Sequence, residues 1–281
     1  PGEAAGTESL CVVDPESMEA TAVVQYPKDE ARIFLGGSTG ADYWQLGKRV
    51  LCVRGVFAED TGIQMDALEE AEPQAYLGAN NMIAFDCANG LAVIGAEGAN
   101  VLPTESGESL FLLWEGYLIT EQSDGENTLV RCRAANGDVR NCYTVAFQGT
   151  ESDPLFRGHT AACLWGGAGL YRLQDGGMQQ LTARAVYGFA QDQTDNSFVL
   201  ITHDAGKRVE YIEYAVPMST GDTLIRLRAD GTEEALLPAL PDGSLLLGEV
   251  TGAEKGKVTL GEPVSHIKAG FLIVYGKIEQ N

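Results

Sequence analysis

Short runs of alternating apolar and polar residues recur along most of the chain, and many of them end in a glycine-containing turn. One segment predicts four strands, over residues 110–114, 117–121, 128–133 and 139–146. Alternation with period two is typical of strands that bury one face, and Asn-Gly or Asp-Gly between two such runs predicts a hairpin, because glycine tolerates positive φ. The clearest helical pattern covers only residues 66–72. The pattern as a whole predicts an all-β chain.

A phrase of strand and turn residues is repeated along the chain. Thr-Leu-x-Arg followed by Asn-Gly or Asp-Gly occurs over residues 128–137 and 223–231, and a shorter version contains Arg172. The phrase Leu-Trp-x-Gly precedes two of these repeats. We therefore expect Trp114 and Trp165 to occupy equivalent positions and to pack between neighbouring units.

Four-stranded repeats of ~40–50 residues are typical of a β-propeller, in which each sheet buries its faces against its neighbours. The sequence predicts a propeller of about five or six four-stranded blades. We expect this propeller to be a single domain over residues 11–281, after a flexible, linker-like N-terminus over residues 1–10. The same turn signals also fit β-sandwich domains, which are the alternative.

One of the repeats carries a family resemblance. Its residues are Leu113-Trp114-Glu-Gly116-Tyr117-Leu-Ile119, then Asp124-Gly125, then Thr128-Leu-Val-Arg131. This order resembles the blades of uncharacterised bacterial exported β-propeller repeat proteins and lipoproteins. The resemblance implies a binding or scaffold role outside the cell, and it carries no catalytic motif.

Composition limits the classes of partner. The 281 residues include 19 Lys and Arg against 40 Asp and Glu, a formal net charge of −21, and 44% of the residues are hydrophobic. Such a chain has enough apolar residues for a sizeable core, but it repels the phosphates of nucleic acids and anionic lipids. No apolar run reaches the ~18 residues of a membrane-spanning helix. The small, acidic first residues predict a tether below an N-terminal lipid anchor upstream, and hence an extracellular or cell-surface location in a bacterial envelope.

The sequence contains no recognisable catalytic motif. It has three histidines and no Cys-x-x-Cys pair, and its Gly-x-Ser-x-Gly spacing at residues 36–40 shows no strand–helix context, so we interpret it as a flexible turn. This favours a binding or scaffold protein that recognises a glycan or a protein partner through propeller loops. The alternative is a glycoside-active enzyme with paired carboxylates at the ring centre. A third hypothesis is a purely structural module of an envelope assembly.

Three residues are candidate ligand contacts. Tyr43 and Trp44 precede a predicted turn, and such a pair can form a platform on which a sugar stacks, although packing in the core or in a loop is the other interpretation. His159 lies in a predicted loop, where it either contacts a ligand or makes ordinary hydrogen bonds. We expect no cofactor and no metal site, with calcium in the acidic loop 192–197 as the one ion that the sequence allows.

Two cysteines are placed symmetrically about a predicted turn. The midpoint of Cys132 and Cys142 is (132 + 142)/2 = 137, and Gly137 stands there. In a hairpin with a three-residue turn, this spacing puts the two residues opposite each other, near disulfide distance. The sequence leaves two possibilities open, a disulfide or two thiols in a reducing setting.

Overall fold

Each element that the computed structural model describes is a β-strand. The described residues are 6–38, 40–66, 76–77, 82–96, 98–146, 148–149, 154–174, 176–192, 194–203, 223–236, 250–254, 257–260 and 278–279. In this part of the chain no helix has the length and apolar character that would let it cross a membrane. The helical pattern at 66–72 falls almost wholly outside the described residues.

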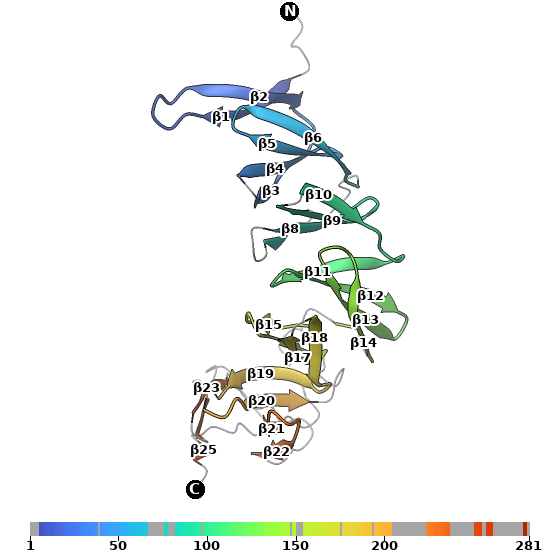
Figure 1. The fold of residues 1–281 in the computed structure, drawn as a ribbon, viewed down its shortest axis with the longest axis vertical. Coiled ribbons are helices and arrows are strands. Elements are labelled where there is room, and N and C mark those ends of the chain that lie inside the picture. Colours follow the sequence, from blue (N-terminus) through green and yellow to red (C-terminus); the bar gives the residue numbers. More distant parts are fainter. Residues whose placement is uncertain are drawn as a thin grey trace, which may run out of the picture. The chain divides into compact units, whose positions relative to one another are not determined.

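The strands form sheets in which neighbours along the chain are neighbours in space (Figure 1). Five sheets have four strands each: β3 (Arg32–Ser38), β4 (Ala41–Leu46), β5 (Arg49–Arg54) and β6 (Phe57–Gln64); β7 (Tyr76–Leu77), β8 (Ile83–Cys87), β9 (Gly90–Gly95) and β10 (Gly98–Leu102); β11 (Glu108–Trp114), β12 (Tyr117–Asp124), β13 (Asn127–Ala134) and β14 (Val139–Val145); β15 (Gly158–His159), β16 (Cys163–Gly166), β17 (Gly169–Gln174) and β18 (Gly177–Thr182); β19 (Ala185–Gln191), β20 (Phe198–His203), β21 (Thr223–Leu227) and β22 (Glu233–Ala235). A two-stranded sheet, β1 (Thr7–Val13) and β2 (Ala20–Pro27), precedes them, and a three-stranded sheet, β23 (Val250–Glu254), β24 (Lys257–Leu260) and β25 (Ile278–Glu279), follows.

The prediction of an all-β chain built from repeated four-stranded units is confirmed. The four strands expected over residues 110–146 are β11 to β14. The three repeated arginines, Arg131, Arg172 and Arg226, lie on β13, β17 and β21, and each of these is the third strand of its sheet. The repeated phrase therefore marks a true structural repeat.

The expectation that Trp114 and Trp165 are equivalent is wrong. Trp114 ends β11, the first strand of its sheet, whereas Trp165 lies within β16, the second strand of the next. Glu115 and Gly116 form the turn after Trp114, and both have positive φ, as a two-residue hairpin turn of this kind requires. Around Trp165 the hairpin instead closes after Gly166, which pairs with Gly169. The shared letters thus encode two different turns.

The N-terminal strand begins earlier than the predicted linker would allow. Residues 7–10 belong to β1 and pair with β2. Leu10 and Val24 pack against a core formed by Tyr26, Leu46 and Leu51, which explains why this polar segment is ordered into a hairpin. Residues 1–5 lie outside the described part of the chain.

Contacts divide the chain into two compact units. The first contains residues 1–122 and 130–142, and the second contains residues 123–129 and 143–281. The prediction of a single domain over residues 11–281 stays a prediction.

Within the first unit, successive sheets share their cores. One cluster joins the β3–β6 sheet to the β7–β10 sheet through side chains such as Tyr43, Val50 and Phe85. Another joins the β7–β10 sheet to β11 and β12 through Leu91, Leu113 and others. The β7–β10 sheet is thus apolar on both faces, because a neighbouring sheet covers each of them. In the second unit, a cluster of the same kind joins the β15–β18 sheet to the β19–β22 sheet.

Candidate functional site

The two aromatic residues predicted as a platform point to opposite faces of the β3–β6 sheet. Successive residues of a strand alternate between faces, and both lie on β4. Tyr43 is 3% exposed and belongs to the core shared with the β7–β10 sheet. Burial, together with the Cys52 thiol, raises the pKa of the Tyr43 hydroxyl. Trp44 is half-buried on the other face.

The ring beside Trp44 is that of Phe34. The two residues are a directly opposed cross-strand pair on β3 and β4, with ring centroids 5.0 Å apart and ring planes inclined by 50°. Phe34 is 51% exposed. We call this pair the aromatic ledge. The sequence reasoning missed Phe34, although its apolar position in β3 was a signal that could have identified it.

The ledge is exposed because, among the strands that the structure describes, only β1 and β2 cover this face of the sheet. The β1–β2 hairpin packs over Leu46 and Leu51, while β3 and β4 carry the ledge. The other face of the same sheet is buried against a four-stranded sheet. Neighbouring strands are ~4.8 Å apart, so a hairpin spans about half the width of a four-stranded sheet.

Three side chains hold the hairpin in place beside the ledge. Glu8 of β1 forms an ion pair with Arg32 of β3. Arg32 also donates a hydrogen bond to the Tyr26 hydroxyl of β2, at 3.2 Å. The Arg32 guanidinium, which lies two residues before Phe34 on β3, therefore binds side chains of the hairpin.

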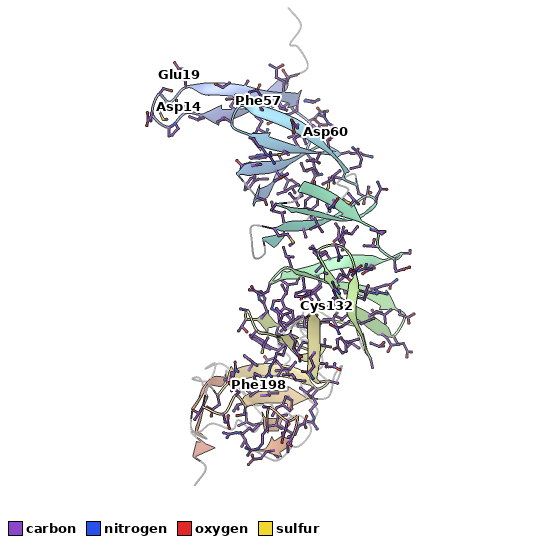
Figure 2. The ribbon with its side chains drawn as sticks, viewed as in Figure 1. Asp14, Glu19, Phe57, Asp60, Cys132 and Phe198 are labelled. Carbon is purple, nitrogen blue, oxygen red and sulfur yellow. The ribbon has the colours of Figure 1, made fainter. Side chains whose placement is uncertain are left out.

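Carboxylates stand beside the ledge. Asp42 is exposed, two residues before Trp44 on the same face, and it faces Gly37 of β3. A Cβ atom at Gly37 would lie 3.2 Å from Asp42 Oδ1, so the glycine leaves room for this carboxylate. The row of opposed residues that contains the ledge runs from Phe34 through Trp44 and Leu51 to Asp60, which is exposed on β6 (Figure 2). An apolar ring surface bordered by hydrogen-bond acceptors is suited to binding.

A second polar cluster lies in the same unit but is buried. The Glu108 side chain is 0% exposed and accepts two hydrogen bonds from Arg133, at 2.7 and 2.8 Å. It also accepts hydrogen bonds from the Thr120 hydroxyl and from the backbone N–H of Glu105, and Arg131 Nη1 is 3.8 Å away. Burial alone would raise the pKa of Glu108, but the hydrogen bonds from Arg133 and Thr120 outweigh it and lower the pKa.

Asp86 is the carboxylate that could form an acid–base pair with Glu108. Its two oxygens accept the backbone N–H of Leu110, at 3.0 and 3.1 Å. Burial raises the pKa of Asp86, and the charge of Glu108 raises it further. A raised and a lowered pKa in one neighbourhood resemble an acid–base pair. The Glu108 oxygens, however, are taken up by Arg133, Thr120 and Glu105, so this carboxylate serves the packing of its sheet.

His159 lies in the second unit, at the end of the short strand β15. It is exposed and pairs with Leu164. Nearby in sequence, the Arg157 guanidinium lies 4.3 Å from the centroid of the Tyr187 ring, a cation–π contact. The role of His159 as a ligand contact stays a prediction.

The two cysteines of the predicted pair differ in environment. Cys132 is buried on β13 and Cys142 is exposed on β14. In the turn between these strands, Ala134 donates a backbone hydrogen bond to Asp138 and accepts one from Gly137. The disulfide stays a prediction.

The acidic loop proposed for calcium uses its carboxylates within its own turns. Asp192 accepts the N–H of Thr194 and Asp195 accepts that of Ser197, both at 2.9 Å. The Ser197 hydrogen bonds lower the pKa of Asp195. Over the described ranges, no group of three or more His, Cys, Asp or Glu side chains could hold a metal ion. Calcium binding stays a prediction.

Comparison with known proteins gives no family. No protein-family model and no curated protein matches the sequence. Among solved structures, the chain is similar to a TolB candidate from Agrobacterium tumefaciens, at 10% identity over 84% of this chain and 90% of that chain, with a TM-score of 0.34. It is also similar to a protein of unknown function from Bacteroides caccae, at 13% identity over 83% of this chain and 89% of that one, with a TM-score of 0.28.

A third solved structure, a gluconolactonase from Xanthomonas campestris, is 13% identical over 83% of this chain and 88% of that one, with a TM-score of 0.17. TM-scores in this range do not establish a shared fold. The repeated four-stranded architecture follows from the sheets themselves.

Proposed function

We propose that this protein is an exported or cell-surface binding scaffold, and that its four-stranded units are blades of a propeller-type structure. The stacked sheets provide a rigid support, and the ligand, a glycan or a protein segment, engages the aromatic ledge. A preorganised surface of this kind binds with little loss of conformational freedom.

The exposure of the ledge carries this proposal. Large apolar side chains that stay accessible on a sheet face mark interaction sites more often than single exposed residues do. Phe34 and Trp44 are in mutual contact, and both rings are held by strand pairing. The neighbouring positions of the same row lie either beneath the hairpin or at the carboxylate border.

The binding experiment uses a panel of immobilised bacterial cell-wall fragments, soluble glycans and envelope-protein peptides. We expect the wild-type chain to bind at least one probe, and the Phe34→Ala and Trp44→Ala variants to lose that binding. Phe57→Ala is the matched control. Phe57 is 74% exposed on the same sheet, but it pairs with Arg54 and lies on the face opposite to the ledge. Binding that survives both ledge substitutions would overturn the proposal.

A further inference from the structure

We infer that the ligand of the ledge is a neutral glycan, which rests its C–H face on Trp44 and Phe34 while its hydroxyls donate to the Asp42 carboxylate. This inference rests on the proposed function and names the class of ligand. It is carried by the combination of rings and acceptors at one place on the β3–β6 sheet, and each part constrains the ligand separately.

The rings select a ligand with an apolar, weakly polarised face. An aromatic face is negative and its edge positive, so it attracts C–H groups that carry partial positive charge. Sugar rings whose hydroxyls are equatorial present such C–H groups on both faces. The planes of Phe34 and Trp44 are inclined by 50°. A flat ligand ring can therefore stack on only one of these two side chains and meets the other from the side. This arrangement fits a saccharide chain better than a flat heteroaromatic ligand.

The polar groups at the ledge select a ligand that donates hydrogen bonds. Asp42 is two residues from Trp44 along β4, which is ~7 Å. Asp60 is two strands from Trp44, which is ~10 Å. A carboxylate only accepts hydrogen bonds, so each of them requires a donor such as a hydroxyl. Asp42 lies within the reach of a short oligosaccharide placed on the rings, whereas Leu51, which the hairpin covers, lies between Trp44 and Asp60.

The charges disfavour an acidic glycan. The Asp42 carboxylate lies on the same face as Trp44, two residues away along β4, and the chain carries a net charge of −21. The cations of this face, Arg32 and Arg49, belong to the row nearest the hairpin, and Arg32 is paired with Glu8. Like charges brought together without a partner repel each other, so a uronate or sulfate next to Asp42 is expected to bind more weakly than a neutral sugar.

The test compares two oligosaccharides of equal length, cellohexaose as the neutral probe and hexagalacturonate as the acidic one, by isothermal titration calorimetry. We expect the neutral probe to bind at least about tenfold more tightly at low salt, and the difference to shrink as salt screens the carboxylates. The Asp42→Asn variant is expected to bind cellohexaose several-fold more weakly and hexagalacturonate more tightly. Phe57→Ala is expected to change neither affinity.

The outcomes separate this inference from the proposed function. If hexagalacturonate binds as well as cellohexaose and Trp44→Ala abolishes both, the ledge is a binding site but the inference of a neutral ligand is wrong. If only peptides bind, and bind through Trp44, the inference is likewise wrong. If no probe depends on Trp44, the proposed function fails as well.

Accessibility of the ledge is tested on the protein without ligand. Acrylamide is expected to quench the part of the tryptophan fluorescence that disappears in Trp44→Phe. A Trp44 contribution that acrylamide cannot quench would show that other parts of the protein cover the ledge, and would overturn the inference.

Discussion

The β3–β6 and β11–β14 sheets each carry a tryptophan and an acidic side chain, yet the two pairs differ in how fully they are surrounded. Trp114 is 1% exposed, and the Glu108 carboxylate is saturated by donors from its own sheet. Trp44 is half-buried, and Asp42 faces solvent across a glycine. Residue type is therefore a poor guide to function here. The extent of coverage separates a structural side chain from one that can bind.

The largest expected effect is on the tryptophans. Trp114→Ala removes a fully buried ring and is expected to lower the free energy of unfolding by about 3–5 kcal/mol. Trp44→Ala removes a ring that solvent already reaches, and is expected to cost only about 1–2 kcal/mol. Urea denaturation of the two variants measures both values. Equal losses would show that the ledge is part of the core, and the contrast between the sheets would disappear.

The Glu108 cluster is expected to be nearly as sensitive. Glu108→Gln leaves the buried Arg133 guanidinium without its anion and is expected to cost about 3–5 kcal/mol. Replacing both partners, as Glu108→Leu with Arg133→Met, is expected to recover much of that loss, because no unpaired charge stays buried. Asp42→Asn is the matched control and is expected to change the free energy of unfolding by less than about 0.5 kcal/mol. A double variant as unstable as the single one would contradict this account.

The same cluster predicts a dependence on pH. The pKa of Glu108 is lower in the folded state than its usual value, so its stabilisation is complete above pH ~4.3 and is lost as the pH falls through the folded pKa. The difference in unfolding free energy between wild type and Glu108→Gln is expected to shrink over that interval. The pKa of Asp86 is raised in the folded state, so its effect on stability is opposite. Its contribution to the free energy of unfolding is present at low pH and is lost as the pH rises through the folded pKa. Denaturation series between pH 3 and pH 7 on wild type, Glu108→Gln and Asp86→Asn check the two signs.

The smallest expected effect is on ligand affinity, through the position of the Asp42 carboxylate. Gly37→Ala places a methyl group 3.2 Å from Asp42 Oδ1 and shifts that carboxylate by a few tenths of an ångström. We expect binding of cellohexaose to weaken by about two- to fivefold while the urea midpoint stays unchanged. Calorimetry and denaturation on the same sample distinguish this from a loss of fold. Unchanged affinity would exclude Asp42 from the binding site.

The repeats were predictable from the sequence because turn chemistry is local. Asn-Gly and Asp-Gly fix hairpins, and the arginine at a constant step identified the third strand in three sheets. Alternation within β4 also determines that Tyr43 and Trp44 lie on opposite faces, once residues 41–46 are recognised as a strand. That single assignment would have excluded Tyr43 from the predicted platform.

Other features depend on contacts between distant residues. Phe34 meets Trp44 only through the pairing of β3 with β4, which shifts by one residue between Phe34 and Gly36. The burial of Glu108 depends on Arg133, 25 residues away. The exposure of the ledge depends on how many strands cover it, which no local pattern encodes.

The hairpin that leaves the ledge open also has a consequence for proteolysis. Its turn, residues 14–19, is exposed and contains Met18 at a positive φ of 58°. A protease that cut this turn would release no fragment, because β1 stays paired with β2 along its length and Glu8 stays bound to Arg32. A nick at this point would add two chain ends while both strands keep their places.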